Sequence, residues 1–156
     1  MRRHDREITN FQEIIKIMES CQVCRLALNN GTYPYILPVN FGMEVDGKTV
    51  TLYFHGAREG TKYDLMHADP HASFEMDCET ILCSRLEEGN CTMSYKSVIG
   101  QGLVEFLEGE EKLHALDVLV AHYHPEGFPY ATQVIPATTV WKLTVDSMTA
   151  KYRPMK

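Results

Sequence analysis

The stretch TLYFHGAREGTK, residues 51–62, joins a strand pattern to a glycine-bracketed loop and a helix start. Apolar and polar side chains alternate up to Phe54, and β-branched and aromatic residues favour a half-buried strand. The alternation ends at His55, after which Gly56 and Gly60 bracket a tight turn, because glycine tolerates backbone conformations that other residues avoid. The stretch therefore predicts a strand, a loop and a helix in immediate succession.

A helix is predicted over residues 61–68, with Thr61 as its N-cap. Backbone N–H groups and the helix dipole favour an anion at such a start, and His55, Arg58 and Lys62 add donors. An ordinary strand-to-helix connection with solvated charges is the alternative. The segment is not a P-loop, because its glycine-to-lysine spacing is one residue short and threonine precedes the lysine.

The size and charge of the chain limit its class. A length of 156 residues favours a single domain over 1–156 with a sizeable core. No apolar run approaches the ~20 residues of a membrane span, and the charged N-terminus lacks the apolar region of a secretion signal. A net charge of −6 argues against a nucleic acid partner. We therefore expect a cytoplasmic protein with neither a nucleic acid nor a membrane partner.

The chain has five cysteines, and Cys21-x-x-Cys24 resembles a redox pair or half of a zinc site. A zinc ribbon needs a second pair of this spacing, which Cys78 and Cys83 do not provide. We therefore favour reduced, mostly buried thiols and expect no metal site.

Hydrophobic periodicity predicts three helices and six strands. The first helix is capped by Thr9 and ends near Ser20; the others cover residues 61–68 and 110–123. In the last of these, Leu113, Leu116, Val120 and Tyr123 should share a buried face. The predicted strands cover residues 23–28, 33–41, 50–54, 71–76, 91–107 and 138–145, and residues 77–90 are expected to be irregular.

Prolines and glycines modify two of these strands. Pro34 and Pro38 cannot donate ladder hydrogen bonds, so their strand should lie at an edge, bulge, or open for a ligand. Gly100 and Gly102 predict a bulge or bend within residues 91–107. Because hairpins outnumber crossovers, the pattern is typical of a mostly β fold, a small antiparallel barrel with flanking helices.

Three blocks of sequence resemble one family when taken in order: YPY at 33–35 with PVNF at 38–41, LYFHGA at 52–57 with Gly60 and Lys62, and SYKSVI at 94–99 with Gly102. These blocks are similar to the pyridoxamine 5′-phosphate oxidase-related flavoproteins, in particular the nitroimidazole-resistance (Nim) subgroup. The resemblance implies a split β-barrel homodimer with FMN at the dimer interface. A barrel filled by its own side chains leaves little room for a flavin, so a groove between two copies is physically reasonable.

The resemblance also implies site residues. Cofactor contacts are expected from three segments: His55, Gly56 and Lys62 at the phosphate with Phe54 beside them in the chain, Pro38, Val39 and Asn40 beside the isoalloxazine ring, and Tyr95, Ser97 and Val98 from the facing subunit. In Nim-like proteins a histidine near the position of His71 lies by the flavin, so His71 is interpreted as an acid/base or substrate-orienting residue. A capping or surface role for His71 is the alternative.

The implied function is that of an FMN-dependent oxidoreductase. FMN would accept a hydride from NAD(P)H and pass electrons to a small acceptor such as a nitroaromatic. NAD(P)H would bind transiently, because no strand–G-x-G-x-x-G–helix unit is present. Vitamin B6 oxidation is not expected, since residues 150–156 do not match the basic C-terminus of the oxidase proper. A flavin- or haem-binding module without turnover, and a plain interaction domain, are the alternatives.

Other histidines and the tryptophan have structural interpretations. His67 and His71 do not form a helical metal pair, because Pro70 intervenes. His122 and His124 are interpreted as partners of a helix C-terminus, and Trp141 as a core or interface residue.

Overall fold

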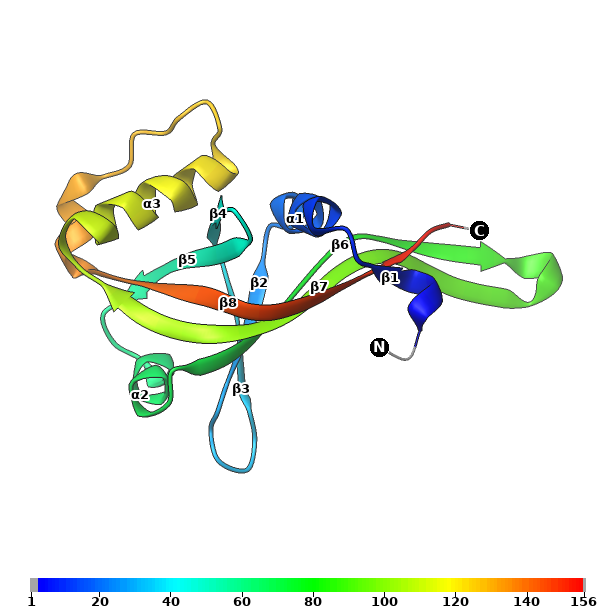
Figure 1. Cartoon of the computed structure of the whole chain (residues 1–156), viewed down its shortest axis with the longest axis horizontal. Helices are drawn as coiled ribbons and strands as arrows, with labels where there is room; N and C mark the ends of the chain where they lie inside the picture. The colour runs from blue at the N-terminus through cyan, green and yellow to red at the C-terminus, as the bar shows by residue number, and fades with distance from the viewer. Residues whose placement is uncertain (1–2, 156) are drawn as a thin grey trace.

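A computed structural model describes residues 3–155, which form an eight-stranded antiparallel sheet with three α-helices (Figure 1). The strands are β1 (Glu7–Ile8), β2 (Cys24–Leu28), β3 (Tyr35–Val39), β4 (Gly42–Asp46), β5 (Thr49–Ala57), β6 (His71–Arg85), β7 (Asn90–Leu107) and β8 (Thr138–Arg153). The α-helices are α1 (Phe11–Ser20), α2 (Thr61–Ala68) and α3 (Gly109–Tyr123), and 3-10 turns cover η1 (His4–Arg6), η2 (Leu86–Glu88) and η3 (Thr132–Ala137).

The strand order is β3-β2-β6-β7-β8-β5-β4, with β1 paired to β8. This path ends at β3 and β4, so the sheet curls without closing. The arrangement is the mostly β, split-barrel fold that the sequence implied, and the antiparallel sheet with flanking helices is confirmed. The two strands beyond the predicted six are the short β1 and the edge strand β4.

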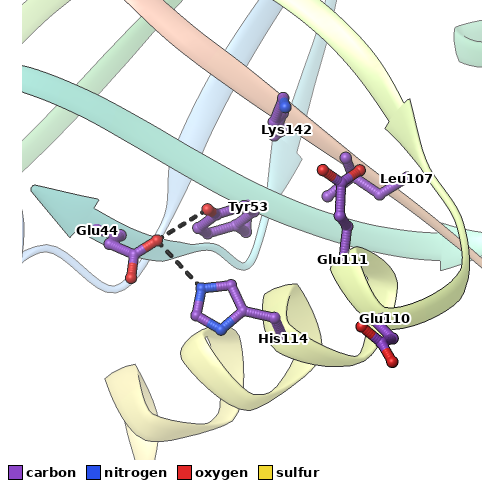
Figure 2. A pocket seen from close by; sticks show the side chains of 7 residues that line it. All are labelled: Glu44, Tyr53, Leu107, Glu110, Glu111, His114 and Lys142. Atoms are coloured by element: carbon purple, nitrogen blue, oxygen red, sulfur yellow. Dashed lines mark hydrogen bonds and ion pairs between the residues drawn. The ribbon is translucent and has the colours of Figure 1, made fainter. Parts of the chain in front are cut away.

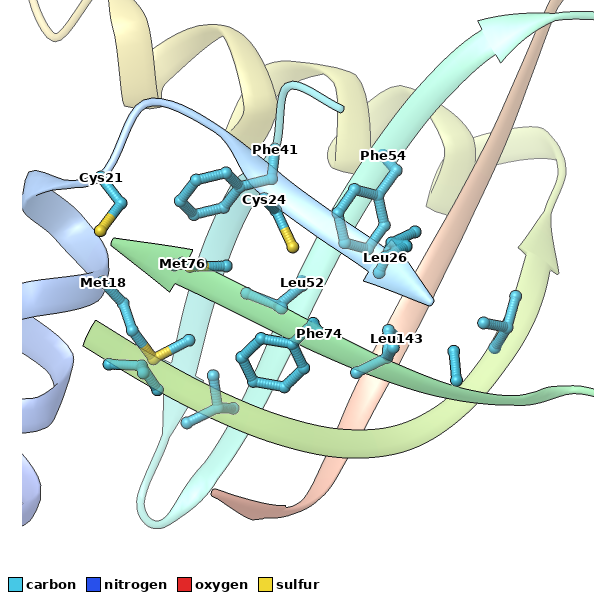
Figure 3. Packing of buried hydrophobic residues seen from close by; sticks show 14 of the residues in the cluster. Met18, Cys21, Cys24, Leu26, Phe41, Leu52, Phe54, Phe74, Met76 and Leu143 are labelled. Atoms are coloured by element: carbon cyan, nitrogen blue, oxygen red, sulfur yellow. The ribbon is translucent and has the colours of Figure 1, made fainter. Parts of the chain in front are cut away.

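The main core lies on the inner face of the curled sheet (Figure 3). Phe74 and Met76 of β6 pack there with Leu52 of β5 and Leu143 of β8. Trp141 is fully buried in the same cluster, which confirms its interpretation as a core residue. Fully burying a large apolar side chain contributes about 1.5–3 kcal/mol, so this cluster is the main source of stability.

Helix α1 covers one end of this core with four buried residues: Ile14, Ile15, Ile17 and Met18. Its N-cap is Asn10, whose side chain accepts a hydrogen bond from the Glu13 N–H at 3.2 Å. The prediction of Thr9 as the cap was wrong by one residue. Both residue types can cap, and only the backbone position decides between them.

Strand β5 continues through the predicted loop. His55 pairs with Val140 and Gly56 with Thr139, so the strand ends only at Ala57. The break in side-chain alternation did not end the strand, because backbone pairing with β8 does not depend on side-chain type.

Helix α2 has the predicted bounds, but its N-cap is Gly60 and not Thr61. Gly60 has a φ of 140°, a backbone conformation that residues other than glycine rarely adopt. Thr61 is the first helical residue, and no side chain caps this helix.

The proline-containing strand β3 lies at an edge of the sheet, as predicted. Pro38 pairs with Arg25 of β2, the only strand beside it. Because no strand within residues 3–155 lies on the other side of β3, the missing N–H of Pro38 leaves no carbonyl of a further strand without a donor.

Strands β6 and β7 extend beyond the rest of the sheet as a two-stranded arm, closed by η2 (Figure 1). The prediction that residues 77–90 are irregular was wrong. The register shifts between Cys78 and Ile81, where Glu79 adopts a positive φ of 52°, and pairing then continues to Arg85 and Asn90. The arm exposes large apolar side chains: Ile81, Leu82, Leu86 and Met93.

The predicted bulge near Gly100 and Gly102 is present. Gln101 pairs with Ser147 and Gly102 with Val145, so Asp146 is the extra residue of β8. Val145 and Met148 both pack against the main core, on either side of this bulge. A Cβ on Gly102 would lie 2.0 Å from the Thr144 carbonyl oxygen, which explains the need for glycine there.

Helix α3 packs against β4, β5 and β8 over a second, smaller apolar cluster: Tyr53, Leu107, Ala115, Leu116 and Val140. Leu113 is exposed, so the predicted buried face was partly wrong. The face is rotated toward Lys112, Ala115 and Leu119. No helix within residues 3–155 has the length and apolar character needed to cross a membrane.

The cysteines are free thiols, of which Cys21 and Cys24 are buried; Cys78 and Cys83 are partly exposed and Cys91 is exposed, so the expectation of mostly buried thiols was wrong. Burial raises the pKa of the Cys21 and Cys24 thiols well above the ordinary value. Within residues 3–155, no group of three or more His, Cys, Asp or Glu side chains is placed to hold a metal ion.

Candidate functional site

The end of β5 and the start of α2 form a small cradle around Gly56. A Cβ on Gly56 would lie 2.6 Å from the Tyr63 hydroxyl oxygen and 3.3 Å from Cε of Lys62. The Tyr63 hydroxyl is buried and makes no hydrogen bond of ordinary geometry within residues 3–155; burial raises its pKa, and the nearby Thr139 side chain opposes that rise. A buried donor without a partner costs about 1–3 kcal/mol, so this hydroxyl is available to a ligand atom.

One cation lies at this cradle, and a second follows two residues after Gly56 in the chain. The Lys62 ammonium lies 4.4 Å from the Tyr63 ring centroid, and Arg58 donates to the Pro136 carbonyl. Neither side chain forms an ion pair with a carboxylate of the described residues. A small anion would therefore find two uncompensated positive charges and an unused hydroxyl here.

His55 does not join Lys62 in this cradle. Successive side chains of a strand point to opposite faces. Phe54 lies in the main core and Tyr53 in the cluster under α3, so the His55 imidazole points to the α3 side. Although the ring reaches solvent, its partial burial lowers the pKa of His55. A contact from His55 to a ligand at Gly56 would have to come from its backbone.

Several predicted side chains lie instead on the outer face of β3, β2, β6, β7 and β8, which we call the open face. Pro38, Ser97 and His71 point to this face, because their strand neighbours Val39, Val98 and Ala72 belong to or pack on the main core. No helix of the described residues covers the open face. Three of its apolar side chains are exposed: Ile36 by 64%, Ile99 by 52% and Leu103 by 43%.

Two hollows mark the open face. The first, with a volume of about 190 Å³, is lined by His71, Asn29, Ser73, Gln101 and Asp146 among others. The second, of about 140 Å³, is lined by Ser97, Ile99, Thr149 and Lys151. The open face therefore offers polar recesses between apolar side chains.

His71 in the first hollow is oriented by Asp69. Its Nδ1 lies 2.6 Å from the Asp69 carboxylate, which also accepts the His71 backbone N–H at 3.0 Å. These bonds, with one from Asn29, lower the pKa of Asp69 to about 2. The Asp69 carboxylate fixes the orientation of the His71 ring through Nδ1, so Nε2 is the ring nitrogen without a partner in the described chain.

Most of the remaining predicted residues lie in neither the cradle nor the open face. Phe54, Val39 and Val98 point into the core, Asn40 follows β3, and Tyr95 lies toward the arm. Val104, whose N–H bonds to the Pro70 carbonyl near α2, is seven residues from Ser97 along β7, or roughly 23 Å. One chain therefore does not bring the segment 95–98 to the Gly56 cradle.

A cavity of about 330 Å³ is lined by none of the predicted site residues (Figure 2). It lies between α3 and the sheet, where Glu44 accepts hydrogen bonds from Tyr53 (2.9 Å) and His114 (3.1 Å). Hydrogen bonds from His114 and Tyr53 lower the pKa of Glu44. Burial, followed by the hydrogen bond to Glu44, raises the pKa of Tyr53 to about 12. Sequence reasoning missed this network because Glu44 and His114 are 70 positions apart.

Comparisons with known proteins identify the family and the fold. A family model described as pyridoxamine 5′-phosphate oxidase matches residues 11–152. A candidate 5-nitroimidazole antibiotic resistance protein from Bacteroides thetaiotaomicron is 32% identical, with 93% of this chain and 85% of that chain covered and a TM-score of 0.79.

Two more distant structures share the fold. One is an FAD- and haem-binding protein from Mycobacterium smegmatis, with 18% identity, 94% of this chain and 73% of that chain covered, and a TM-score of 0.80. The other is a flavocytochrome from Azotobacter vinelandii, with 20% identity, 99% and 72% covered, and a TM-score of 0.73. No curated protein matches the chain.

Proposed function

The chain belongs to the pyridoxamine 5′-phosphate oxidase family, and from this we propose that it is an FMN-dependent oxidoreductase acting as a homodimer. The reaction would transfer electrons from NAD(P)H to a small acceptor, with a nitroaromatic as the first candidate. The similarity to a candidate nitroimidazole-resistance protein over 93% of the chain supports this acceptor class.

The observation that carries the proposal is the cradle at Gly56. Lys62 and Arg58 supply positive charge, the Tyr63 hydroxyl supplies an unused donor, and Gly56 leaves the space that a side chain would fill. Phosphate groups bind best to several charge-assisted donors, so these residues fit the phosphate of FMN. We assign Lys62 and Tyr63 to this phosphate.

When bound, FMN would supply the two-electron chemistry. The chain's own residues would bind the phosphate, exclude water and hold a proton. His71, oriented through Nδ1 by Asp69, presents Nε2 to the hollow on the open face and would orient or protonate the acceptor there.

The open face supports the proposed homodimer. Ile36, Ile99 and Leu103 would leave water if a second copy covered this face, and each such side chain contributes up to about 1.5–3 kcal/mol when buried. The second copy would also bring its own Tyr95–Val98 segment toward the first copy's flavin, which one chain cannot do. The cofactor site would then be complete only in the dimer.

The test begins with the purified full-length protein. We expect a flavin absorbance spectrum, FMN in the mass spectrum of the released ligand, and NAD(P)H oxidation that accelerates when a nitroimidazole is added. The variant His71→Gln should keep its flavin and lose turnover.

Two outcomes would contradict the proposal. A protein that is colourless and does not bind added FMN is not a flavoprotein. A flavin-loaded protein that never oxidises NAD(P)H is a binding module without turnover.

A further inference from the structure

A pocket of about 260 Å³ lies where the two ends of the described chain meet, and its lining is strongly basic. It is formed by Arg3, Arg6 and Arg153 with one carboxylate, Asp5, and by Pro154. The local charge is therefore about +2, three arginines against one aspartate, in a chain whose net charge is −6. A concentration of arginines against the overall charge of the protein indicates an anionic ligand.

The arginines in this pocket are unequally occupied. Arg3 donates two hydrogen bonds to the Asp5 carboxylate, at 2.8 and 2.7 Å. Arg6 reaches the same carboxylate only at 3.8 Å. Arg153 forms no ion pair with any side chain of the described residues. Asp5 thus satisfies Arg3, while Arg6 and Arg153 keep donors free for a ligand.

The pocket continues the open face. Arg153 is two residues beyond Lys151 on β8 and therefore points to the same side as Lys151, which lines the hollow with Ser97. The register pairs Ser147 with Gln101 in the hollow of His71, so the His71 hollow, the Ser97 hollow and the arginine pocket follow one another along β8. From Ser147 to Arg153 this line is roughly 20 Å long.

We propose that Arg6 and Arg153, supported by Arg3, bind the phosphate groups of an adenine nucleotide at the end of the open face beyond Ile99, outside the apolar side chains that the proposed second copy would cover. The guanidinium fork matches phosphate oxygens in pairs, which favours phosphate over a single carboxylate. This inference rests on the proposed function, because the nucleotide is then the NAD(P)H donor. The phosphate contacted is either the pyrophosphate of both donors or the 2′-phosphate of NADPH.

The test uses nucleotide fragments that cannot transfer electrons, so that binding is separated from turnover. ADP and 2′,5′-ADP are titrated by calorimetry into the full-length, FMN-supplemented protein. Arg153→Gln and Arg6→Gln should each raise the Kd at least tenfold. The matched control is Arg85→Gln at the tip of the arm, where Arg85 pairs only with Glu88 and lies about 17 Å along β7 from the residue opposite Arg153. The control should leave the Kd unchanged.

The two fragments identify the phosphate. A preference of at least tenfold for 2′,5′-ADP assigns the pocket to the 2′-phosphate of NADPH, and a preference of at least tenfold for ADP, which alone carries a diphosphate, assigns it to the pyrophosphate. Equal affinities assign it to the 5′-phosphate that both fragments share. A second measurement uses the unmodified protein: the NMR signals of arginine Nε–H groups should shift when either fragment is added. Shifts would support the pocket even if a variant did not fold.

The inference is overturned if neither fragment binds the unmodified protein, or if the arginine variants bind both as tightly as the parent. It is also overturned if those variants change only the monomer–dimer equilibrium, since the arginines then serve the subunit contact. Fragment binding that depends on Arg153, in a protein that never oxidises NAD(P)H, would reject the proposed function and keep the pocket.

Discussion

At the scale of single residues, the Tyr63 hydroxyl has the least ordinary environment. It is buried next to Gly56 and has no partner in the described chain. A buried polar group without a hydrogen bond destabilises the protein that contains it, unless a ligand provides the bond. Tyr63 therefore reports directly on whether the cradle is a ligand site.

Tyr63→Phe separates these two roles. Without flavin, the variant should be more stable to urea by about 1 kcal/mol, because an unsatisfied group is removed. With FMN, the variant should bind the cofactor more weakly than the parent. Tyr130→Phe is the control, since its hydroxyl donates to Asp117 at 2.7 Å near the surface and its loss should be slightly destabilising. A flavin-free Tyr63→Phe protein less stable than the parent would mean that the hydroxyl has a partner within the fold.

Lys62→Ala tests the charge beside the cradle. Removing a charge-assisted hydrogen bond costs about 1.5–3 kcal/mol, so FMN affinity should fall by roughly ten- to a hundredfold while the melting temperature of the flavin-free protein stays the same. Lys48→Ala, in the exposed turn between β4 and β5, is the matched control. FMN affinity is measured by fluorescence quenching. Equal affinities of Lys62→Ala and the parent would show that the FMN phosphate does not bind at Lys62.

Because of Tyr53, the stability of the protein should depend on pH in the alkaline range. Its pKa is raised to about 12 in the folded state, above the unfolded value near 10, so the unfolded chain loses this proton first. The stabilisation is complete below pH 10 and is lost as the pH rises toward 12. Between pH 9 and 12 the parent should lose about 2 kcal/mol more unfolding free energy than Tyr53→Phe, measured by urea denaturation. Equal losses would show that the phenol titrates normally.

At the scale of elements, the sequence predicted strands that have one buried face. Prolines identified β3 as an edge strand, and glycines located the bulge of β7 and β8. The arm was missed because both of its faces meet solvent, so no buried side imposes a period of two on residues 77–90. His55 was assigned to a loop for a different reason. Its place in β5 depends on pairing with β8, more than 80 positions later in the sequence.

The close packing of helix α3 against β4 depends on Gly42. A Cβ there would lie 2.5 Å from Cα and 2.6 Å from N of Leu119, and helix backbone cannot move aside as a flexible side chain can. Gly42→Ala should therefore displace α3 from β4 and cost about 1–3 kcal/mol in urea denaturation. Val45→Ala, at an exposed position of the same strand, should change stability by less than about 0.5 kcal/mol. A fully stable Gly42→Ala protein would mean that α3 is not packed against β4 as described.

At the scale of the whole molecule, the candidate site could be predicted only in pieces. Motif spacing located Gly56, Lys62 and the 95–98 segment, but the distance between them shows that one chain does not join them. The Glu44–Tyr53–His114 network and the arginine pocket depend on contacts between distant positions, which a single sequence does not reveal.

Ile99→Glu tests the proposed dimer. A charge in the middle of the open face should be costly to bury, so the variant should sediment as a monomer and lose FMN. Val45→Glu, on β4 at the opposite edge of the sheet, should remain a dimer and keep its flavin. A dimeric, flavin-loaded Ile99→Glu protein would place the subunit contact elsewhere.

The extra residue of β8 has a consequence for how the chain tolerates length changes. Before Asp146 the inward side chains are odd-numbered, as at Leu143 and Val145, and after it they are even-numbered, as at Met148 and Ala150. Deleting Asp146 alone would remove the bulge and restore strict alternation, so Met148 and Ala150 would still point inward and Ser147 and Thr149 outward. A gene that loses this one codon would thus encode a chain whose C-terminal strand is straighter but keeps the same residues on its buried side.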